Sequence, residues 1–283
     1  MVLNNGVMPT WIKYIKPFAD PFLTLIYWSY FTLGYIIFFS PFYVGTAVIF
    51  KNRERIFQRL NHFFYRGFFS LVRKITPGLS IHIQDQVLSI RSSVIISNHV
   101  SYLDPILLIS LYGMQKTIVK SVFFRLPIFG WVIKNSGYLP SETGDDLNTL
   151  MIEQIEGMEG YLASGGNLFI FPEGTRSRDG KIGRLNKGAF KIARRCHAPI
   201  SVLFIQNTDR LFRPEKLLFN TCIQNTIKIE LIGNIMPDDQ RSLPSISHLM
   251  TEVLNMMEAR QNTLTPYPSR QGDTCKDSIE ENL

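Results

Sequence analysis

Residues 21–50 form a run of thirty amino acids without a charged side chain, and no other feature constrains this chain as strongly. About 20 apolar residues cross the core of a bilayer, so the run is long enough to span a membrane. It is too long for the apolar part of a cleavable signal peptide, and no small-residue cleavage site follows it. A buried core helix is the alternative, but the many Phe, Tyr and Trp side chains favour a membrane segment. Because Pro41 interrupts helical hydrogen bonding, one tilted span and two short helices dipping into one leaflet are both open.

Basic residues cluster directly after the apolar run. Seven of them face a single acid, Glu54, over the next 24 positions: Lys51, Arg53, Arg55, Arg59, Arg66, Arg73 and Lys74. By the positive-inside rule, we expect the domain that follows to face the cytoplasm. Apolar residues recur between these charges at helical spacing, at Ile56, Leu60, Phe63, Phe64, Phe68, Leu71, Val72 and Ile75. This stripe predicts a helix that lies on anionic head groups, packs on the domain, or does both.

Composition excludes some classes of protein. With 45% hydrophobic and 19% charged residues over 283 positions, the chain is neither disordered throughout nor of low complexity. A net charge of +7 favours an anionic partner. Cys196, Cys222 and Cys275 are scattered and form no CxxC pair, so neither a disulfide framework nor a cysteine zinc site is expected, and a reducing compartment fits best. No nucleic-acid motif is found, and the histidines lack the spacing of zinc ligands.

The rest of the chain predicts an α/β fold. Short β-rich runs at 80–84, 94–97, 117–120, 167–171, 201–206 and 226–232 alternate with helical patterns, among them 146–164 and 249–257. Alternation of this kind predicts a central, largely parallel sheet covered by helices. We therefore divide the chain into a membrane-anchoring and basic amphipathic segment (1–75), an α/β domain (76–264) and a disordered tail (265–283).

The first candidate motif follows the predicted strand 94–97. It reads Asn98-His99-Val100-Ser101-Tyr102-Leu103-Asp104. If the turn folds back, the Asp104 carboxylate can hold one ring nitrogen of His99 while the other nitrogen takes a proton. Alternatively, Asp104 is an N-cap for an apolar helix over 106–111, and His99 is only structural.

The second motif follows the predicted strand 167–171. It reads Pro172-Glu173-Gly174-Thr175-Arg176-Ser177-Arg178-Asp179-Gly180. Gly174 lets the backbone approach a ligand closely, and Arg176 can bind a phosphate with two parallel hydrogen bonds. Pro-Glu-Gly and Arg-Asp-Gly are also ordinary turn sequences, and a turn and a binding site are compatible here.

Together, these motifs resemble the first and third signature blocks of the glycerolipid acyltransferase family, whose best-known members are the 1-acylglycerol-3-phosphate acyltransferases. Lys120, residues 124–131 and Gly137-Tyr138 resemble the second block, and Ala198-Pro199-Ile200 resembles the fourth. The resemblance covers residues 94–205, and four blocks in order are far more specific than the His/Asp spacing alone.

The resemblance implies transfer of a fatty acyl group from an acyl-CoA or acyl-carrier-protein thioester to a lysolipid hydroxyl. No metal, no cofactor and no covalent acyl-enzyme are expected. His99 would be the general base and Asp104 its orienting partner, while Lys120 and Arg176 would bind phosphate. Glu173, Gly174 and Thr175 would also bind the substrate: backbone N–H groups around Gly174 would stabilise the oxyanion, and Glu173 would shape that loop. The partners implied are membrane lipids, the lysolipid acceptor and the acyl donor.

One departure affects the acceptor. Phosphatidate-forming members usually carry an arginine a few residues after the second-block glycine, whereas Gly137 is followed by Tyr138-Leu139-Pro140-Ser141-Glu142-Thr143. A lyso-aminolipid or another lysophospholipid is therefore an alternative to 1-acylglycerol-3-phosphate. A non-catalytic lipid-binding protein is a further alternative. Hydrolysis with Ser101 or Ser177 as the nucleophile is disfavoured because the chain has no G-x-S-x-G motif.

Overall fold

The computed structural model describes residues 12–142, 147–176, 181–214, 216–237 and 244–264. The tail predicted over 265–283 lies outside them. Seven strands form one sheet in the order β1-β7-β6-β2-β5-β3-β4. Their bounds are β1 Leu79–Ile83, β2 Val94–Ser97, β3 Gln115–Val119, β4 Leu139–Pro140, β5 Asn167–Ile170, β6 Ile200–Gln206 and β7 Asn225–Ile235.

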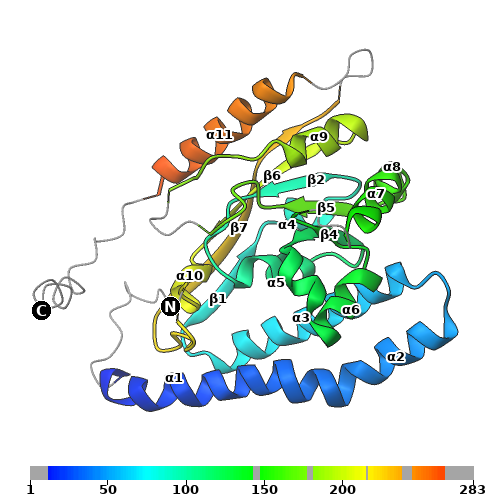
Figure 1. Cartoon of the computed structure of the whole chain (residues 1–283). Helices are drawn as coiled ribbons and strands as arrows, with labels where there is room; N and C mark the ends of the chain where they lie inside the picture. Colours follow the sequence, from blue (N-terminus) through cyan, green and yellow to red (C-terminus); the bar gives the residue numbers. More distant parts are fainter. Residues whose placement is uncertain (1–11, 143–146, 177–180, 215, 238–243, 265–283) are drawn as a thin grey trace, which may run out of the picture.

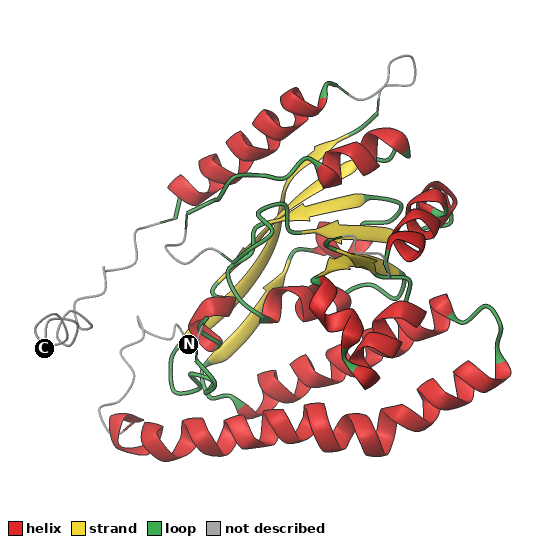
Figure 2. Ribbon diagram, viewed as in Figure 1, coloured by secondary structure: helices red, strands yellow, loops and turns green. Residues whose placement is uncertain are grey.

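Helices surround this sheet (Figures 1 and 2). At the N-terminus lie α1 Ile12–Ser29, the π-helical η1 Tyr30–Phe39, α2 Ser40–Ile49 and α3 Glu54–Ile75. Between the strands lie α4 Asp85–Ser89, α5 Leu103–Ile109, the 3-10 helix η2 Ser121–Arg125, α6 Pro127–Asn135, α7 Asn148–Glu156, α8 Met158–Ala163, α9 Gly188–Arg195 and α10 Thr208–Leu211. The last described helix is α11 Ile246–Asn262.

The sheet confirms the prediction of a largely parallel α/β fold. Every neighbouring pair of strands is parallel except β6 and β7. Each of the six predicted strands is present, with ends that differ by at most three residues. The sequence analysis missed β4, because two residues are too few to show an alternating pattern.

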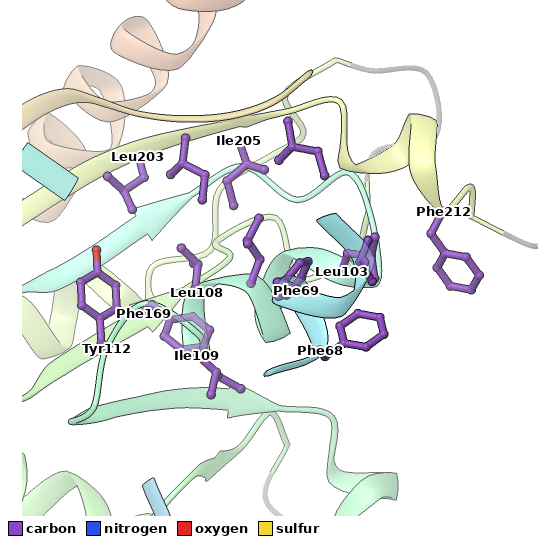
Figure 3. Close-up of a cluster of buried hydrophobic side chains, with 14 of the residues drawn as sticks. Phe68, Phe69, Leu103, Leu108, Ile109, Tyr112, Phe169, Leu203, Ile205 and Phe212 are labelled. Atoms are coloured by element: carbon purple, nitrogen blue, oxygen red, sulfur yellow. The ribbon is translucent and has the colours of Figure 1, made fainter. Parts of the chain in front are cut away.

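Side chains alternate between two cores on opposite faces of the sheet. Ile95 and Phe169 belong to the core beneath α3 and α5, whereas Val94 and Leu168 belong to the core beneath α8, α9 and α11. The close-up of the first core shows Phe169 beside α5 residues such as Leu108 (Figure 3). Because both faces are covered, the central strands are buried throughout, as expected of parallel strands between helices.

The helix predicted over 146–164 is divided in two. α7 ends at Glu156 and α8 begins at Met158, with Gly157 between them. Glycine is a weak helix former because its backbone loses the most conformational freedom on folding, so the helix is interrupted at Gly157. Residue 146 lies outside the described part of the chain.

α1, η1 and α2 follow one another as a single long rod along the edge of the molecule, and α3 returns beside it in the opposite direction (Figure 1). We refer to residues 12–49 as the N-terminal rod. The rod is fastened to the α/β domain by polar contacts. Asp20 accepts hydrogen bonds from the backbone N–H (2.8 Å) and hydroxyl (2.6 Å) of Thr221, and the Tyr27 hydroxyl pairs with that of Thr76 at 2.6 Å.

The opposite side of the rod is apolar and uncovered. Its exposed side chains include Phe18, Phe22, Leu25, Leu33, Ile36, Ile37, Phe38, Phe42, Val48 and Ile49. The stretch Tyr14–Ile49 is long and apolar enough to cross a membrane, and only 11% of its most apolar window is buried. It is therefore not a core helix of the α/β domain.

Pro41 does not break the rod, contrary to one of the two predictions. The helix changes to π-helical hydrogen bonding over η1, where the N–H of Ser40 reaches the carbonyl of Tyr35. The Ser40 hydroxyl donates to the carbonyl of Ile36 at 2.6 Å. Since proline has no N–H to offer, this hydroxyl satisfies a carbonyl in the turn before it.

The basic amphipathic helix is present as α3, and it packs on the domain. Phe64, Phe68 and Val72 of the predicted stripe are buried, whereas Phe63 is exposed. Polar residues share the buried face: Gln58 and Asn61 bond to Ser136, and Asn61 also bonds to Tyr138. α3 therefore lies between the rod and the domain, and most of its stripe is unavailable to lipid.

Candidate active site

The first motif brings His99 and Asp104 together at the carboxyl end of β2. His99 Nδ1 lies 2.9 Å from Asp104 Oδ2. The carboxylate is fully buried, and its Oδ2 also accepts the backbone N–H groups of Val100 and Ser101, both at 2.7 Å. The hydroxyl of Thr208 donates to the other oxygen. The N-cap alternative is wrong, because α5 begins at Leu103 and the carboxylate bonds back into the loop before it.

Two side chains force the loop to fold back in this way. The amide of Asn98 pairs with the backbone of Ile205 at 2.9 and 2.7 Å and so ties the end of β2 to β6. The hydroxyl of Ser101 donates to the carbonyl of Phe212 at 2.9 Å and accepts the N–H of Leu103 at 3.2 Å. With both ends fixed, the His99 ring has little freedom to leave Asp104.

Phe171, the residue directly before the second motif, covers one side of His99. The rings of His99 and Phe171 stack with centroids 4.4 Å apart. Because Nδ1 faces Asp104, Nε2 is the nitrogen available to a substrate, and it makes no hydrogen bond with the described residues. A neutral imidazole held in this way can accept a proton at Nε2 while the carboxylate stabilises the imidazolium.

Glu173 connects the two motifs and is placed to shape the site rather than to bind a substrate. Its Oε1 accepts the backbone N–H of His99 at 3.1 Å, and its Oε2 accepts that of Gly183 at 3.0 Å. Burial raises the pKa of the Glu173 carboxyl, although these N–H donors act in the opposite direction. The carboxylate therefore holds the backbone of His99 and the chain after the second motif in register.

Gly174 makes the turn that the sequence predicts. Its φ of +69° lies in the left-handed region, and its N–H donates to the carbonyl of Phe171 at 3.1 Å. That N–H closes the turn, so the oxyanion donor expected around Gly174 has to be another group. Thr175, the next residue, is exposed. The last four positions of the motif, 177–180, lie outside the described residues.

Arg176 returns toward the first motif. Its guanidinium lies over the ring of Tyr102, 3.3 Å from the centroid. Its Nη1 is buried and has no hydrogen-bond partner among the described residues. Arg176 thus contacts the first motif through Tyr102, two residues before Asp104, and keeps a buried donor unused, an arrangement that suits a phosphate.

Lys120 lies at the same edge of the sheet but farther away. It follows β3, which β5 separates from β2. Strands in a sheet are about 4.8 Å apart, so the ends of β2 and β3 are roughly 10 Å from each other. The side chain is exposed, and its ammonium group bonds to none of the residues described. The structure thus joins His99, Asp104 and Glu173 by hydrogen bonds, brings Arg176 against Tyr102 of the first motif, and leaves Lys120 at the rim.

Some residues of the site were not predicted from the sequence. Thr208 bonds to Asp104 across 104 positions of sequence, and the residues next to Thr208 in the chain give no sign of that role. Tyr102 belongs to the first motif and Phe171 directly precedes the second, but only the folded chain places the ring of Phe171 against His99 and that of Tyr102 against Arg176. Among the described residues, no three His, Cys, Asp or Glu side chains are grouped as metal ligands would be.

Comparison with known proteins agrees with this geometry. Residues 78–206 match the family model described as Acyltransferase. This part of the chain is similar to an acyltransferase domain. It contains both motifs, whereas Thr208 falls just after it. Pro199 of the fourth block lies directly before β6, at the opposite end of the sheet from His99, and its carbonyl accepts the N–H of Val94 at 2.9 Å.

Two relatives illustrate how far the likeness extends. The chain is 34% identical over 118 residues to a chloroplastic 1-acyl-sn-glycerol-3-phosphate acyltransferase, BAT2, of Brassica napus, which covers 42% of this chain and 34% of the relative. It is 31% identical over 157 residues to a 1-acyl-sn-glycerol-3-phosphate acyltransferase of Saccharomyces cerevisiae, covering 53% of this chain and 50% of that protein. The chain thus spans a third to a half of the length of these curated relatives.

A solved structure extends the likeness beyond residues 78–206. The crystal structure of the 1-acyl-sn-glycerophosphate acyltransferase PlsC from Thermotoga maritima superposes with a TM-score of 0.66 at 19% identity. The match covers 89% of this chain and 99% of that one. At this identity the comparison establishes the fold.

Proposed function

We propose that this protein transfers a fatty acyl group from an acyl-CoA or acyl-carrier-protein thioester to the free hydroxyl of 1-acylglycerol-3-phosphate and so forms phosphatidate. The observation that carries the proposal is the His99–Asp104 pair, 2.9 Å apart and inside a region similar to an acyltransferase domain. The printed names of the relatives support the acceptor, since they are 1-acyl-sn-glycerol-3-phosphate acyltransferases.

The reaction would proceed in one addition and one elimination. His99 Nε2 takes the proton of the acceptor hydroxyl as its oxygen attacks the thioester carbonyl. Asp104 stabilises the imidazolium while the tetrahedral oxyanion exists. The carbon–sulfur bond then breaks, the new ester forms, and the imidazolium returns its proton to the leaving thiolate. The N–H of Thr175 is our candidate for the oxyanion donor, because that of Gly174 closes a turn.

Arg176 would bind the phosphate of the acceptor. Its guanidinium has a buried nitrogen without a described partner, and the aromatic face of Tyr102 holds it against the first motif. Lys120 would reach the same phosphate from the rim, as a point charge on a flexible stem.

A different lysolipid acceptor is the second candidate. Two residues support it. Gly137 is not followed by the arginine that phosphatidate-forming members usually carry. Tyr138, the next residue, is buried, and its hydroxyl bonds to Gln115 at 2.9 Å and to Asn61 at 3.1 Å. The cation expected after Gly137 is therefore missing, and a lyso-aminolipid or another lysophospholipid would need fewer cations.

The exposed apolar side of the N-terminal rod would lie in the membrane. Because Asp20 and Tyr27 fasten the opposite side to the domain, we propose that the rod lies along one leaflet instead of standing across the bilayer. The positive charge that follows the rod would keep the active site on the cytoplasmic side.

Product analysis tests the proposal. The purified protein is incubated with each of several lysolipids and with acyl-CoA or acyl-carrier protein, and the products are identified by mass spectrometry. We expect phosphatidate from 1-acylglycerol-3-phosphate, and no product from a matched sample of the His99→Ala variant. Acylation of an amine-containing lysolipid alone would support the second candidate, and no acylated product from any pair would contradict both.

A further inference from the structure

The corner formed by η2 and α6 presents an apolar surface. Its large side chains point into solvent: Val122 is 61% exposed, Ile128 60%, Leu126 45%, Phe123 39% and Phe129 39%. The rings of Phe123 and Phe129 meet edge to face with centroids 5.7 Å apart. Five exposed apolar residues within eight positions are more than a soluble surface usually carries, so this corner is built to meet another apolar phase.

The same segment carries only positive charge. From residue 115 to residue 141 the sequence contains Lys116, Lys120, Arg125 and Lys134 but no Asp or Glu. Lys116 is buried in an ion pair with Glu54 at 2.8 Å, which leaves the other three cations for the surface. Apolar side chains with basic neighbours suit an anionic bilayer, because the former enter the acyl region while the latter meet the head groups.

A pocket of about 440 Å³ opens beside this corner. Its apolar walls come from Phe124, Leu126, Pro127, Trp131 and Leu147. Arg125 and Lys134 also line it, and they approach from opposite ends of α6. Neither side chain forms a hydrogen bond or ion pair with the described residues.

The chemistry of the pocket defines its ligand. Two cations over apolar walls match a molecule with a phosphate next to a glycerol ester and acyl chains. A nucleic acid or an acidic protein would use the cations but leave the exposed Val122 and Ile128 in water. None of the residues lining the pocket belongs to the dyad, and neither Arg176 nor Lys120 lines it.

We infer that this pocket binds the phosphate head group of an anionic bilayer phospholipid that is not the reacting acceptor. Val122, Phe123 and Ile128 then enter the same leaflet beside the bound lipid, and the protein gains a membrane contact separate from its N-terminal rod. The site requires only an anionic phospholipid and does not depend on acyl transfer.

Trp131 provides a direct probe. The chain has three tryptophans, so Trp11→Phe with Trp28→Phe leaves Trp131 as the only indole. Dihexanoylphosphatidylglycerol, added below its micelle concentration, should change the Trp131 emission saturably. Dihexanoylphosphatidylcholine should bind at least roughly tenfold more weakly, because its head group carries no net charge. Arg125→Gln and Lys134→Gln should each weaken binding by about fivefold, the effect of one cation near an anionic surface.

Lys191→Gln on α9 is the matched control, since it removes an exposed cation from another helix and should leave binding unchanged. The inference is wrong if the emission does not saturate, if the choline lipid binds equally well, or if Lys191→Gln weakens binding as much as Arg125→Gln.

The titration is repeated with His99→Ala, which should bind normally. Normal binding by an inactive wild-type protein would contradict only the proposed function, and acyl transfer without saturable binding would contradict only this inference. If Arg125→Gln and Lys134→Gln raise the KM of a short-chain lysolipid fivefold, the pocket belongs to the acceptor site and the inference also fails.

Discussion

The two loops of the candidate site differ in how they use their hydrogen bonds. In the loop after β2, Asp104 is fully buried and receives four donors, and Asn98 and Ser101 tie the chain to neighbouring elements. In the loop after β5, Thr175 is exposed and Arg176 keeps a buried nitrogen without a described partner.

This difference matches two kinds of work. A general base has to be held in one orientation before the reaction begins, because its contribution falls quickly with misplacement. A phosphate site needs donors that are not already used, since the ligand must replace its hydration shell with protein groups. Under the proposed function, the loop after β2 would hold the general base, and the loop after β5 would bind the substrate, with Glu173 joining the two loops.

His99→Ala should have the largest effect. Turnover should fall by roughly 10²- to 10⁴-fold, because the proton moves only in the transition state, while binding of the lysolipid changes little. Steady-state kinetics together with equilibrium binding separate the two quantities. Turnover within a factor of two of wild type would contradict the division between the loops.

Arg176→Ala should come next and should depend on the acceptor. Loss of a cation from a desolvated phosphate contact costs about 2 kcal/mol or more, so kcat/KM for lysophosphatidic acid should fall at least roughly 30-fold. An uncharged lysolipid, if accepted, should be spared, and Lys120→Ala should act in the same direction. Equal losses on both acceptors at constant donor would assign Arg176 to the donor or to the loop itself.

Thr208→Val removes one donor from Asp104 at nearly constant volume. A hydrogen bond to a charged group contributes about 1.5 to 3 kcal/mol, so turnover should fall roughly tenfold and the free energy of unfolding should also fall. Asp104→Asn sharpens the comparison, because its amide can donate to the Thr208 hydroxyl and keep the loop folded. Asp104→Asn should therefore lower the free energy of unfolding more in the Thr208→Val protein than in wild type. If the effects of the two substitutions on that free energy simply add, the contact between the introduced amide and Thr208 is not formed.

Glu173→Gln should have the smallest effect. The amide oxygen of glutamine can accept only one of the two N–H groups, that of His99 or that of Gly183. The amide nitrogen then faces the other N–H, so one of the two hydrogen bonds is lost. Because burial raises the pKa of Glu173, the folded state takes up its proton at a higher pH than the unfolded chain. The contribution of Glu173 to stability therefore decreases as the pH rises from its pKa in the unfolded chain, about 4.3, to its higher pKa in the folded protein.

Melting temperatures measured from about pH 7 down to about pH 4.5 test this sign. Wild type should gain on the Glu173→Gln variant as the pH falls, since glutamine does not titrate. A difference that is constant over the range would show that the carboxyl has an ordinary pKa and that the bridge is not buried as described.

Much of the site could be read from local sequence. His99 and Asp104 are five positions apart in one strand-to-helix turn, and Glu173, Gly174 and Arg176 lie within another. The parallel strands were recognisable because residues buried on both faces form short continuous apolar runs. Such signals are local, so they survive without knowledge of the fold.

Tertiary structure alone decided the rest, because it depends on residues far apart in the chain. Thr208 completes the environment of Asp104 across 104 positions, and Glu173 reaches the backbone of His99 across 74. The thirty uncharged residues of segment 21–50 marked it as apolar, but its direction follows from contacts with Thr76 and Thr221 that composition cannot encode. Hydrophobicity is a sum over side chains and is visible in the sequence, whereas a hydrogen bond requires two particular groups to meet, and only the folded chain brings them together.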